Sequence, residues 1–152
     1  MAKMICGGKD MREHIFRGKR WKASPWPGED PWVKGSLIDP GDHEQVAIFP
    51  LFDTASSLGL KDLVRVFAVA VDPDTVGEGT GVFNTRGDEI FEGDLVTMRN
   101  TRKQGLPGVV RYSKLSAGFE IQRNGFVPIP LDGARNDYII CGNIHDDPDK
   151  QK

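Results

Sequence analysis

Long apolar runs are absent from this sequence of 152 residues, of which 38% are hydrophobic. A helix that crosses a membrane needs about 20 consecutive apolar residues, and no run approaches that length. A secretory signal needs an apolar core of about 7–15 residues, which residues 1–10 do not contain. We therefore predict a cytoplasmic protein with no membrane partner, preceded by a disordered extension over residues 1–10.

Charge of one sign is not in excess, and cysteine is scarce. The 20 Lys and Arg residues nearly balance the 22 Asp and Glu residues, so the net charge of −2 gives no overall field that would attract nucleic acid or an anionic membrane. Cys6 and Cys141 have no Cys or His neighbour at metal-binding spacing, which favours reduced thiols over a zinc motif or a disulfide framework. Cys141 lies in an apolar strand pattern, so we expect it to be buried as a small hydrophobic side chain.

Motifs for catalysis and cofactor binding are also missing. The glycine run 77–81 is followed neither by Lys-Ser or Lys-Thr nor by a helical pattern, so it fits neither a phosphate-binding loop nor a dinucleotide fingerprint. No serine lies in a Gly-x-Ser-x-Gly frame. We therefore expect a non-enzymatic protein without a cofactor or metal. The alternative is a metal-dependent hydrolase, whose ligands would come from an acidic cluster: Glu78, Asp88, Glu89, Glu92 and Asp94.

Glycine and proline, by contrast, are abundant, with 18 and 10 residues, which favours short strands and tight turns over helices. Glycine is densest in residues 75–94, which we interpret as a structural junction between two β units, with Gly77, Gly93 and Asp94 as its key residues. We expect Gly93 to supply a positive φ and Asp94 to bond backbone N–H groups at the start of the next strand.

Runs of β-branched and aromatic residues between the turns predict an all-β protein. In the N-terminal half we expect a weak edge or surface strand over residues 13–19 and at most a short helical turn over residues 51–62. The run 63–71 is the clearest strand pattern and is expected at the centre of its sheet. The last five strands in the chain fit a small closed or partly open barrel. Besides 63–71, the expected strands are 32–38, 46–49, 95–98, 108–112, 119–122, 126–127 and 138–144, with Asn124-Gly125 as a two-residue hairpin turn.

Five short pieces occur in an order that resembles the YopX family: IFRGKR at 15–20, WVKGS at 32–36, DPDTVG at 72–77, IFEGDLV at 90–96 and GNI at 142–144. These are small proteins encoded by phages and prophages. The resemblance implies a phage or prophage origin, and an N-terminal barrel-like β region followed by a small C-terminal SH3-like barrel. It implies no biochemical activity.

The chain departs from the family pattern at Gly79 and His145, where an aromatic residue is usual. If the aromatic after GNI packs against the neighbouring barrel, its loss at His145 should loosen the junction. The predicted organisation is a disordered extension at 1–10, an N-terminal β region at 11–74, the glycine-rich junction at 75–94, the SH3-like barrel at 95–145 and a polar tail at 146–152.

Two basic clusters are the best candidates for a binding surface. Small barrels with basic loops and exposed aromatics bind nucleic acid, each stacked base contributing about 1–3 kcal/mol. The same residues on a compact barrel can instead face a protein partner. We favour a host or phage protein, with nucleic acid as the alternative, and a barrel that buries little surface alone is compatible with self-association. The candidate residues are Arg17, Arg20, Trp21, Arg99, Arg102 and Lys103.

Overall fold

The computed structural model describes residues 14–22, 30–50, 68–99, 106–135 and 137–146. Within these ranges the chain forms two antiparallel sheets and a single turn of 3-10 helix, so the all-β prediction is confirmed. None of the helical structure described there has the length and apolarity to cross a membrane. The elements are β1 (Phe16–Lys19), β2 (Trp32–Ile38), β3 (Val46–Pro50), β4 (Val69–Val71), η1 (Pro73–Thr75), β5 (Gly77–Phe83), β6 (Glu89–Phe91), β7 (Asp94–Met98), β8 (Gly108–Ser113), β9 (Gly118–Gln122), β10 (Ile129–Pro130) and β11 (Tyr138–Asn143).

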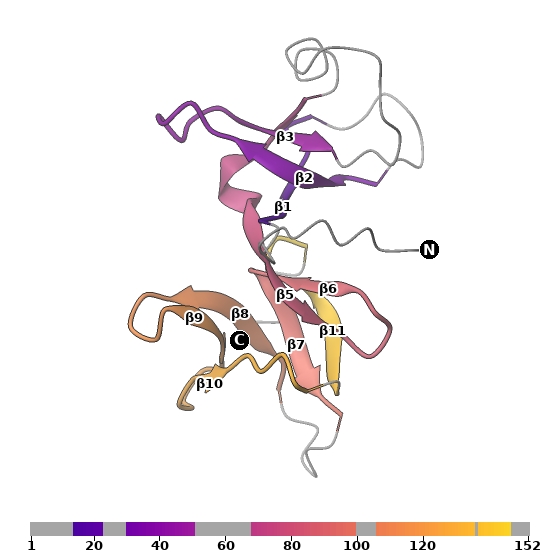
Figure 1. Ribbon diagram of the computed structural model, residues 1–152, viewed down its shortest axis with the longest axis vertical. Helices are drawn as coiled ribbons and strands as arrows, with labels where there is room; N and C mark the ends of the chain where they lie inside the picture. Colours follow the sequence, from indigo (N-terminus) through magenta and orange to yellow (C-terminus); the bar gives the residue numbers. More distant parts are fainter. Residues whose placement is uncertain (1–13, 23–29, 51–67, 100–105, 136, 147–152) are drawn as a thin grey trace, which may run out of the picture.

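The N-terminal sheet has the strand order β4-β3-β2-β1-β5-β6 (Figure 1). Val46 and Ile48 occupy alternate positions of β3 and share one buried cluster with Val33 and Val71, as the two-residue period of a strand requires. The weak pattern at 13–19 gives β1, which is an interior strand rather than an edge. It pairs with β2 on one side and β5 on the other.

The run 63–71, expected at the centre of this sheet, contributes β4 at the sheet's end, so that prediction is wrong. Residues 51–67, which include the ambiguous segment 51–62, lie outside the described ranges. The end of β4 folds back to the end of β1: the Trp21 N–H donates to the Ala70 carbonyl (3.0 Å), and the Asp72 N–H donates to the Lys19 carbonyl (2.7 Å). The sheet therefore curls so that its end strand β4 approaches β1, but the two strands share only a few hydrogen bonds and no continuous ladder. These bonds partly cover the outer edge of β4, the strand that the sequence pattern places at the centre.

The C-terminal sheet has the strand order β10-β9-β8-β7-β11, and its two end strands do not pair with each other. In the described residues, four of the five strands expected here match observed strands to within a residue or two. The core centres on Tyr138, whose hydroxyl accepts a hydrogen bond from the Asp132 N–H at 3.0 Å. The other buried members are Val82, Ile90, Val96, Met98, Val110 and Ile121.

The expected strand 126–127 is wrong, because the chain returns two residues later as β10. Asn124-Gly125 does form a turn, closed by the Phe126 N–H donating to the Arg123 carbonyl at 3.2 Å. Within the turn only Gly125 has a positive φ, of 78°. A two-residue type I′ hairpin needs positive φ at both central positions. The connection between β9 and β10 covers residues 123–128 and is longer than this turn, so Phe126 and Val127 lie outside the ladder.

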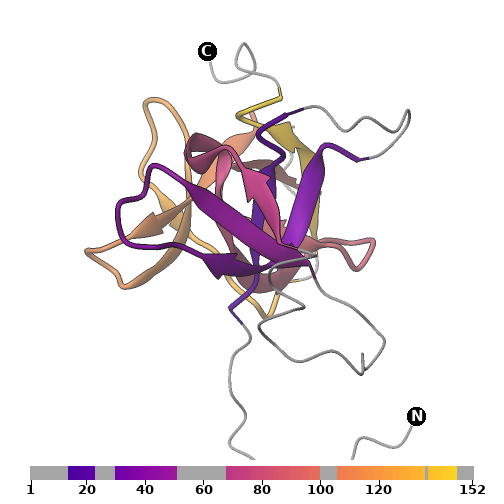
Figure 2. The same cartoon turned by 90° about the horizontal axis from the view of Figure 1, so that it is seen from above.

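The glycine-rich stretch is a strand pair as well as a junction. Its backbone belongs to the N-terminal sheet, since β5 pairs with β1 through Phe16↔Glu78 and with β6 through Gly79↔Phe91. Its side chains Val82 and Ile90 lie in the C-terminal core. Figure 1 shows β5 and β6 between the upper strands β1–β3 and the lower strands β7–β11, and Figure 2 shows β2 and β3 lying over the strands beneath them. The two sheets therefore share one hairpin.

Two glycines of this hairpin meet different demands. A Cβ on Gly77 would lie 2.4 Å from the backbone oxygen of Glu92, so that position has no room for a side chain. Gly93 has the expected positive φ, of 87°, between β6 and β7. A Cβ on Gly79 would lie 2.6 Å from the Glu89 carboxylate, so a side chain at position 79 requires the flexible Glu89 side chain to move.

Cys141 is exposed, contrary to the expectation that it is buried. It lies in β11 as predicted, but the pairing of β11 with β7 shifts register between Ile140 and Gly142. The shift leaves Cys141 as the extra residue of a β-bulge. Tyr138 and Ile140 face the core, so the alternation of the strand points Cys141 to the solvent.

Candidate functional site

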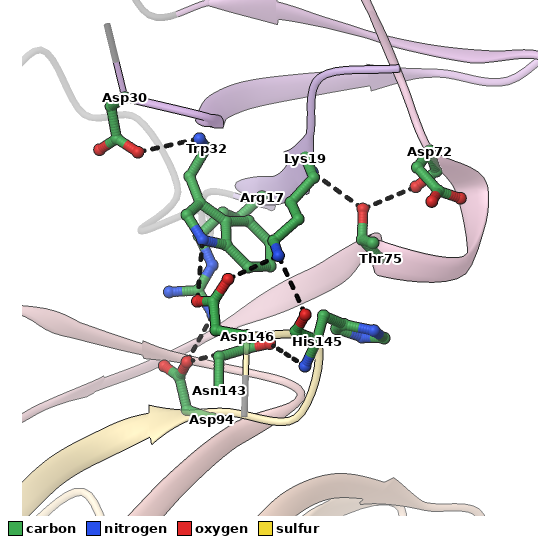
Figure 3. A network of polar contacts seen from close by, with 10 residues as sticks. All are labelled: Arg17, Lys19, Asp30, Trp32, Asp72, Thr75, Asp94, Asn143, His145 and Asp146. Atoms are coloured by element: carbon green, nitrogen blue, oxygen red, sulfur yellow. Dashed lines mark hydrogen bonds and ion pairs between the residues drawn. The ribbon is translucent and has the colours of Figure 1, made fainter. Parts of the chain in front are cut away.

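Arg17 lies where the two sheets meet. Its side chain projects from β1 and is only 13% exposed, and its Nη2 donates to Oδ1 of Asp94 at 2.5 Å (Figure 3). The guanidinium carbon lies 4.6 Å from the ring centre of Trp32 and 4.7 Å from that of Phe91. Stacking of this kind adds cation–π attraction to the ion pair and excludes water from it.

Asp94 is the acceptor on the other side of the junction. Its side chain is 1% exposed, and it is bonded at both oxygens. Oδ1 accepts from Asn143 Nδ2 (3.1 Å) as well as from Arg17, while Oδ2 accepts from the Phe91 N–H (2.9 Å). A carboxylate this buried is stable only when it is paired and hydrogen-bonded, and these contacts meet that condition.

A second contact lies beside the first, between β1 and the end of β11. Lys19 Nζ lies 2.5 Å from Asp146 Oδ1 and donates to the His145 carbonyl at 3.0 Å. Trp32 Nε1 donates to Asp146 Oδ2 at 3.2 Å. Burial raises the pKa of Asp146, but hydrogen bonds from Lys19 and Trp32 outweigh it and hold that pKa below its usual range. Burial, together with the nearby Lys19, lowers the pKa of His145.

These contacts form a structural clamp between the sheets. Asp146, expected in a polar tail, is part of it, and the His145 ring lies 6.4 Å from Trp32, so the usual aromatic position still faces the other sheet. Arg17 was expected on a binding surface. Its guanidinium contacts Asp94 and two rings between the sheets, and a role of Arg17 in binding a partner stays a prediction.

The neighbouring candidates Arg20 and Trp21 lie at the opposite end of β1 from Phe16. Arg20 is half-buried and bridges to Val71. Trp21 is 58% exposed and borders a shallow cavity that also includes Glu44. The two are adjacent, but Arg20 forms part of the sheet and only Trp21 presents a free surface.

Arg99 is the one member of the second basic cluster that the structure describes, and it lies away from the first cluster. Arg99 is exposed and follows β7, whose other end begins at Asp94 in the clamp. Five residues of extended chain span about 16 Å, so Arg99 lies at the far end of the C-terminal sheet from Arg17. Arg102 and Lys103 lie outside the described ranges.

The acidic residues considered for a metal are bonded to other groups. Asp94 is in the clamp, Glu92 accepts from the Tyr112 N–H (3.1 Å), and Glu89 accepts from the Gly81 N–H (3.0 Å). In the part of the chain that the structure describes, no three His, Cys, Asp or Glu side chains gather as a metal site would require. The observed arrangement is the turn and backbone capping that short acidic side chains provide.

A cleft that the sequence did not indicate lies at the β8–β9–β10 side of the C-terminal sheet. Its volume is about 280 Å³, and it holds two arginines beside an exposed aromatic ring. Arg111 projects from β8, and Arg123 follows β9 directly. The full lining is Pro107, Val109, Arg111, Gln122, Arg123, Asn124, Phe126 and Pro128.

Arg123 is the unusual member of this cleft. Its Nε and Nη2 are buried and make no hydrogen bond within the described residues. Its stem lies over Gly108, where an added Cβ would come within 2.9 Å of Arg123 Cγ. A glycine at the start of β8 thus provides the space into which this side chain folds.

Apolar side chains border the same cleft and are open to solvent. Phe126 is 69% exposed and Val127 is 84% exposed, while Ile129 of β10 is exposed at the sheet's edge. The sequence signal for this surface is the short run FVPIP at 126–130, in which prolines limit strand formation and leave large apolar residues outside the ladder.

Comparison with known proteins assigns the chain to a family. A family model described as YopX protein matches residues 50–150. The chain belongs to the YopX family. The match includes the pieces at 72–77, 90–96 and 142–144, and it covers β4 to β11, including Asp94 and the arginine cleft. The pieces at 15–20 and 32–36, which contribute Arg17 and Trp32, precede it. No curated protein matches the chain.

Proposed function

We propose that this YopX-family chain is a phage-encoded, non-enzymatic binding module that holds a host or phage protein in the host cytoplasm. The observation that carries the proposal is the exposed apolar run 126–130 at the edge of the C-terminal sheet, beside a cleft with two arginines. Family membership supports the phage setting.

The composition of this surface is typical of protein interfaces. Phe126 and Val127 adjoin each other, and Arg111 and Arg123 line the neighbouring cleft. Aromatic residues and arginines are enriched where proteins bind each other, whereas large apolar side chains that lie together in solvent are uncommon on proteins without partners.

The edge at β10 favours binding through side chains. The Leu131 N–H donates to the Phe119 carbonyl at 2.9 Å, and Ile129 pairs with Ile121. Because backbone groups alternate in direction along an antiparallel strand, the outward positions on either side of Ile129 are Pro128 and Pro130. Proline has no N–H, so this edge cannot donate to an added strand.

Selection of displayed peptides on the immobilised full chain tests the proposal. We expect selected peptides to bind the wild type and to bind at least about tenfold more weakly when Phe126→Ser and Val127→Ser are combined. Leu115→Ser is the matched control, because Leu115 is a fully exposed apolar residue in the turn at the other end of the β8–β9 hairpin. Selection of no peptide, or equal loss in the control, would contradict the proposal.

Nucleic acid is the second candidate, favoured by the pairing of Arg111 with the exposed ring of Phe126. A basic groove with an aromatic platform is the arrangement by which single strands bind. Mobility shifts with single- and double-stranded DNA and RNA at low salt separate the two candidates. Salt-sensitive binding that is lost on Arg111→Ala would replace the protein partner with nucleic acid.

A further inference from the structure

Two guanidinium nitrogens of the half-buried Arg123, Nε and Nη2, are buried and have no hydrogen-bonding acceptor among the described residues. Guanidinium groups buried in proteins are ordinarily paired with a carboxylate or phosphate, or bonded to carbonyl groups, because an unpaired buried charge is unfavourable. The cleft differs from the clamp in that a second arginine, Arg111, lies in it and no aspartate does. Both arginines line one cavity, whereas Arg17 lies against Asp94.

The charge of the cleft is of one sign. None of its eight lining residues is acidic. The nearest acid by strand register is Glu120, opposite Arg111, and one of its carboxylate oxygens accepts from Gln122 Nε2 at 3.0 Å. Arg111 also lines a neighbouring cavity with Asp74 and Glu92, and Glu92 accepts from the Tyr112 N–H at 3.1 Å. The two positive side chains of the cleft therefore have carboxylates beside them but none in the lining of the cleft itself.

Half of the residues that line the cleft are apolar. Phe126 and Pro128 lie on one strand connection, and Pro107 and Val109 lie at the start of β8. A ligand that fills a cavity of about 280 Å³ must place an anionic group near the arginines and an apolar body against these walls. An acidic residue next to an aromatic or aliphatic residue in a peptide has this form.

We infer that the Arg111–Arg123 cleft binds a carboxylate of the partner protein, from an acidic residue that adjoins an apolar one. This inference rests on the proposed function and names what its surface recognises. A planar carboxylate matches the paired N–H groups of a guanidinium, so Arg111 and Arg123 can hold its two oxygens from different sides. Only two arginines line the cleft and the chain carries a net charge of −2, which suits one carboxylate better than a chain of phosphates.

Defined small probes test the inference without the unknown partner. N-acetylphenylalanine carries a carboxylate on an apolar body, N-acetylphenylalaninamide lacks the charge, and inorganic phosphate lacks the apolar body. We expect N-acetylphenylalanine to shift the NMR signal of the Arg123 Nε–H and the amide signals of 122–126 saturably. The amide should bind at least about tenfold more weakly, since one lost charge-assisted contact is worth that much.

Arg111→Gln and Arg123→Gln should each weaken the carboxylate probe at least about tenfold, whereas Arg99→Gln should leave it unchanged, because Arg99 is an exposed arginine at the end of β7, away from the cleft. The amide spectrum shows that each variant is folded, and the exposed Arg111 keeps the test valid if Arg123→Gln does not fold. Equal shifts from the two phenylalanine probes would overturn the inference.

The outcomes also separate the inference from the proposed function. Phosphate binding stronger than carboxylate binding, lost with the same arginines, would overturn the carboxylate assignment and favour a nucleic-acid ligand. If the carboxylate probe binds but peptide selection fails, the protein-binding function is contradicted while the anion site stands. If selected peptides bind but tolerate Arg111→Gln and Arg123→Gln together, the function stands and this inference is overturned.

Discussion

Two partly buried arginines in this molecule differ in whether a carboxylate of the same chain pairs with them. Arg17 stacks against Trp32 and Phe91, and Arg123 has its Nε and Nη2 buried in a cleft that Phe126 also lines. Arg17 donates to Asp94, whereas Arg123 Nε and Nη2 have no acceptor in the described part of the chain. An arginine that is paired with a carboxylate of its own chain has a structural role, whereas one without such a carboxylate can bind an acidic group of a partner.

Asp94→Ala should have the largest effect, because it gives Arg17 the same unpaired state as Arg123. Removing one partner of a buried pair costs about 3–5 kcal/mol of unfolding free energy. Urea denaturation measures the loss. The double variant Arg17→Met with Asp94→Leu should recover part of it, and equal instability of the single and double variants would show that charge pairing is not the cause.

Gly77→Ala compares the packing of the two regions. Near the clamp the new Cβ would lie 2.4 Å from the Glu92 backbone oxygen, so the backbone must shift, at a cost of about 1–3 kcal/mol. Gly118→Ala, at the start of β9, meets only the Ser116 oxygen at 3.9 Å and should change stability by less than about 0.5 kcal/mol. Thermal unfolding of both variants checks the contrast, which equal destabilisation would remove.

Arg123→Met tests the binding side directly. Methionine keeps the stem that packs over Gly108 and removes the buried unpaired charge, so the variant should be as stable as the wild type or more stable by up to about 1 kcal/mol. Arg17→Met should be clearly destabilising under the same denaturation. A loss of stability in both would mean that Arg123 also has a structural role.

The smallest effect concerns pH at the clamp. The pKa of folded His145 is lowered by burial and by Lys19, so below about pH 6.5 the unfolded state binds the proton more readily. Stability should therefore fall slightly as the pH drops through that value, until the folded pKa is reached. His145→Gln should flatten this part of the pH profile in denaturation experiments at low salt, and an unchanged slope would assign the dependence to another group.

Much of the fold follows from local pattern. Strands β2, β3, β7, β8 and β9 lie where alternating and β-branched residues predict them. The order of the strands in the sheet does not follow from local pattern, because β1 pairs on one side with the distant strand β5, where Phe16 lies opposite Glu78. The sequence does not predict strand β5, because its glycines interrupt the pattern of apolar and β-branched residues. Glycine is needed there because distant backbone lies close, such as the Glu92 oxygen near Gly77.

The site is less predictable than the fold. Gly93 and Asp94 could be assigned to a junction because a positive φ and a capping carboxylate are local properties. The pairing of Arg17 with Asp94 joins residues far apart in the chain, so no spacing reveals that Arg17 is buried. Arg123 resembles any surface arginine in sequence, since its burial depends on the space above Gly108 on another strand.

The place of β1 between β2 and β5 has a consequence for synthesis. Strand β1 leaves the ribosome early and can pair with β2 soon afterwards, but its second partner begins only at Gly77. At about 5–20 residues per second, some 60 intervening residues take roughly 3–12 seconds. For that time one edge of the nascent β1 is open and Arg17 has no Asp94, so the N-terminal half waits for the C-terminal half before it can be completed.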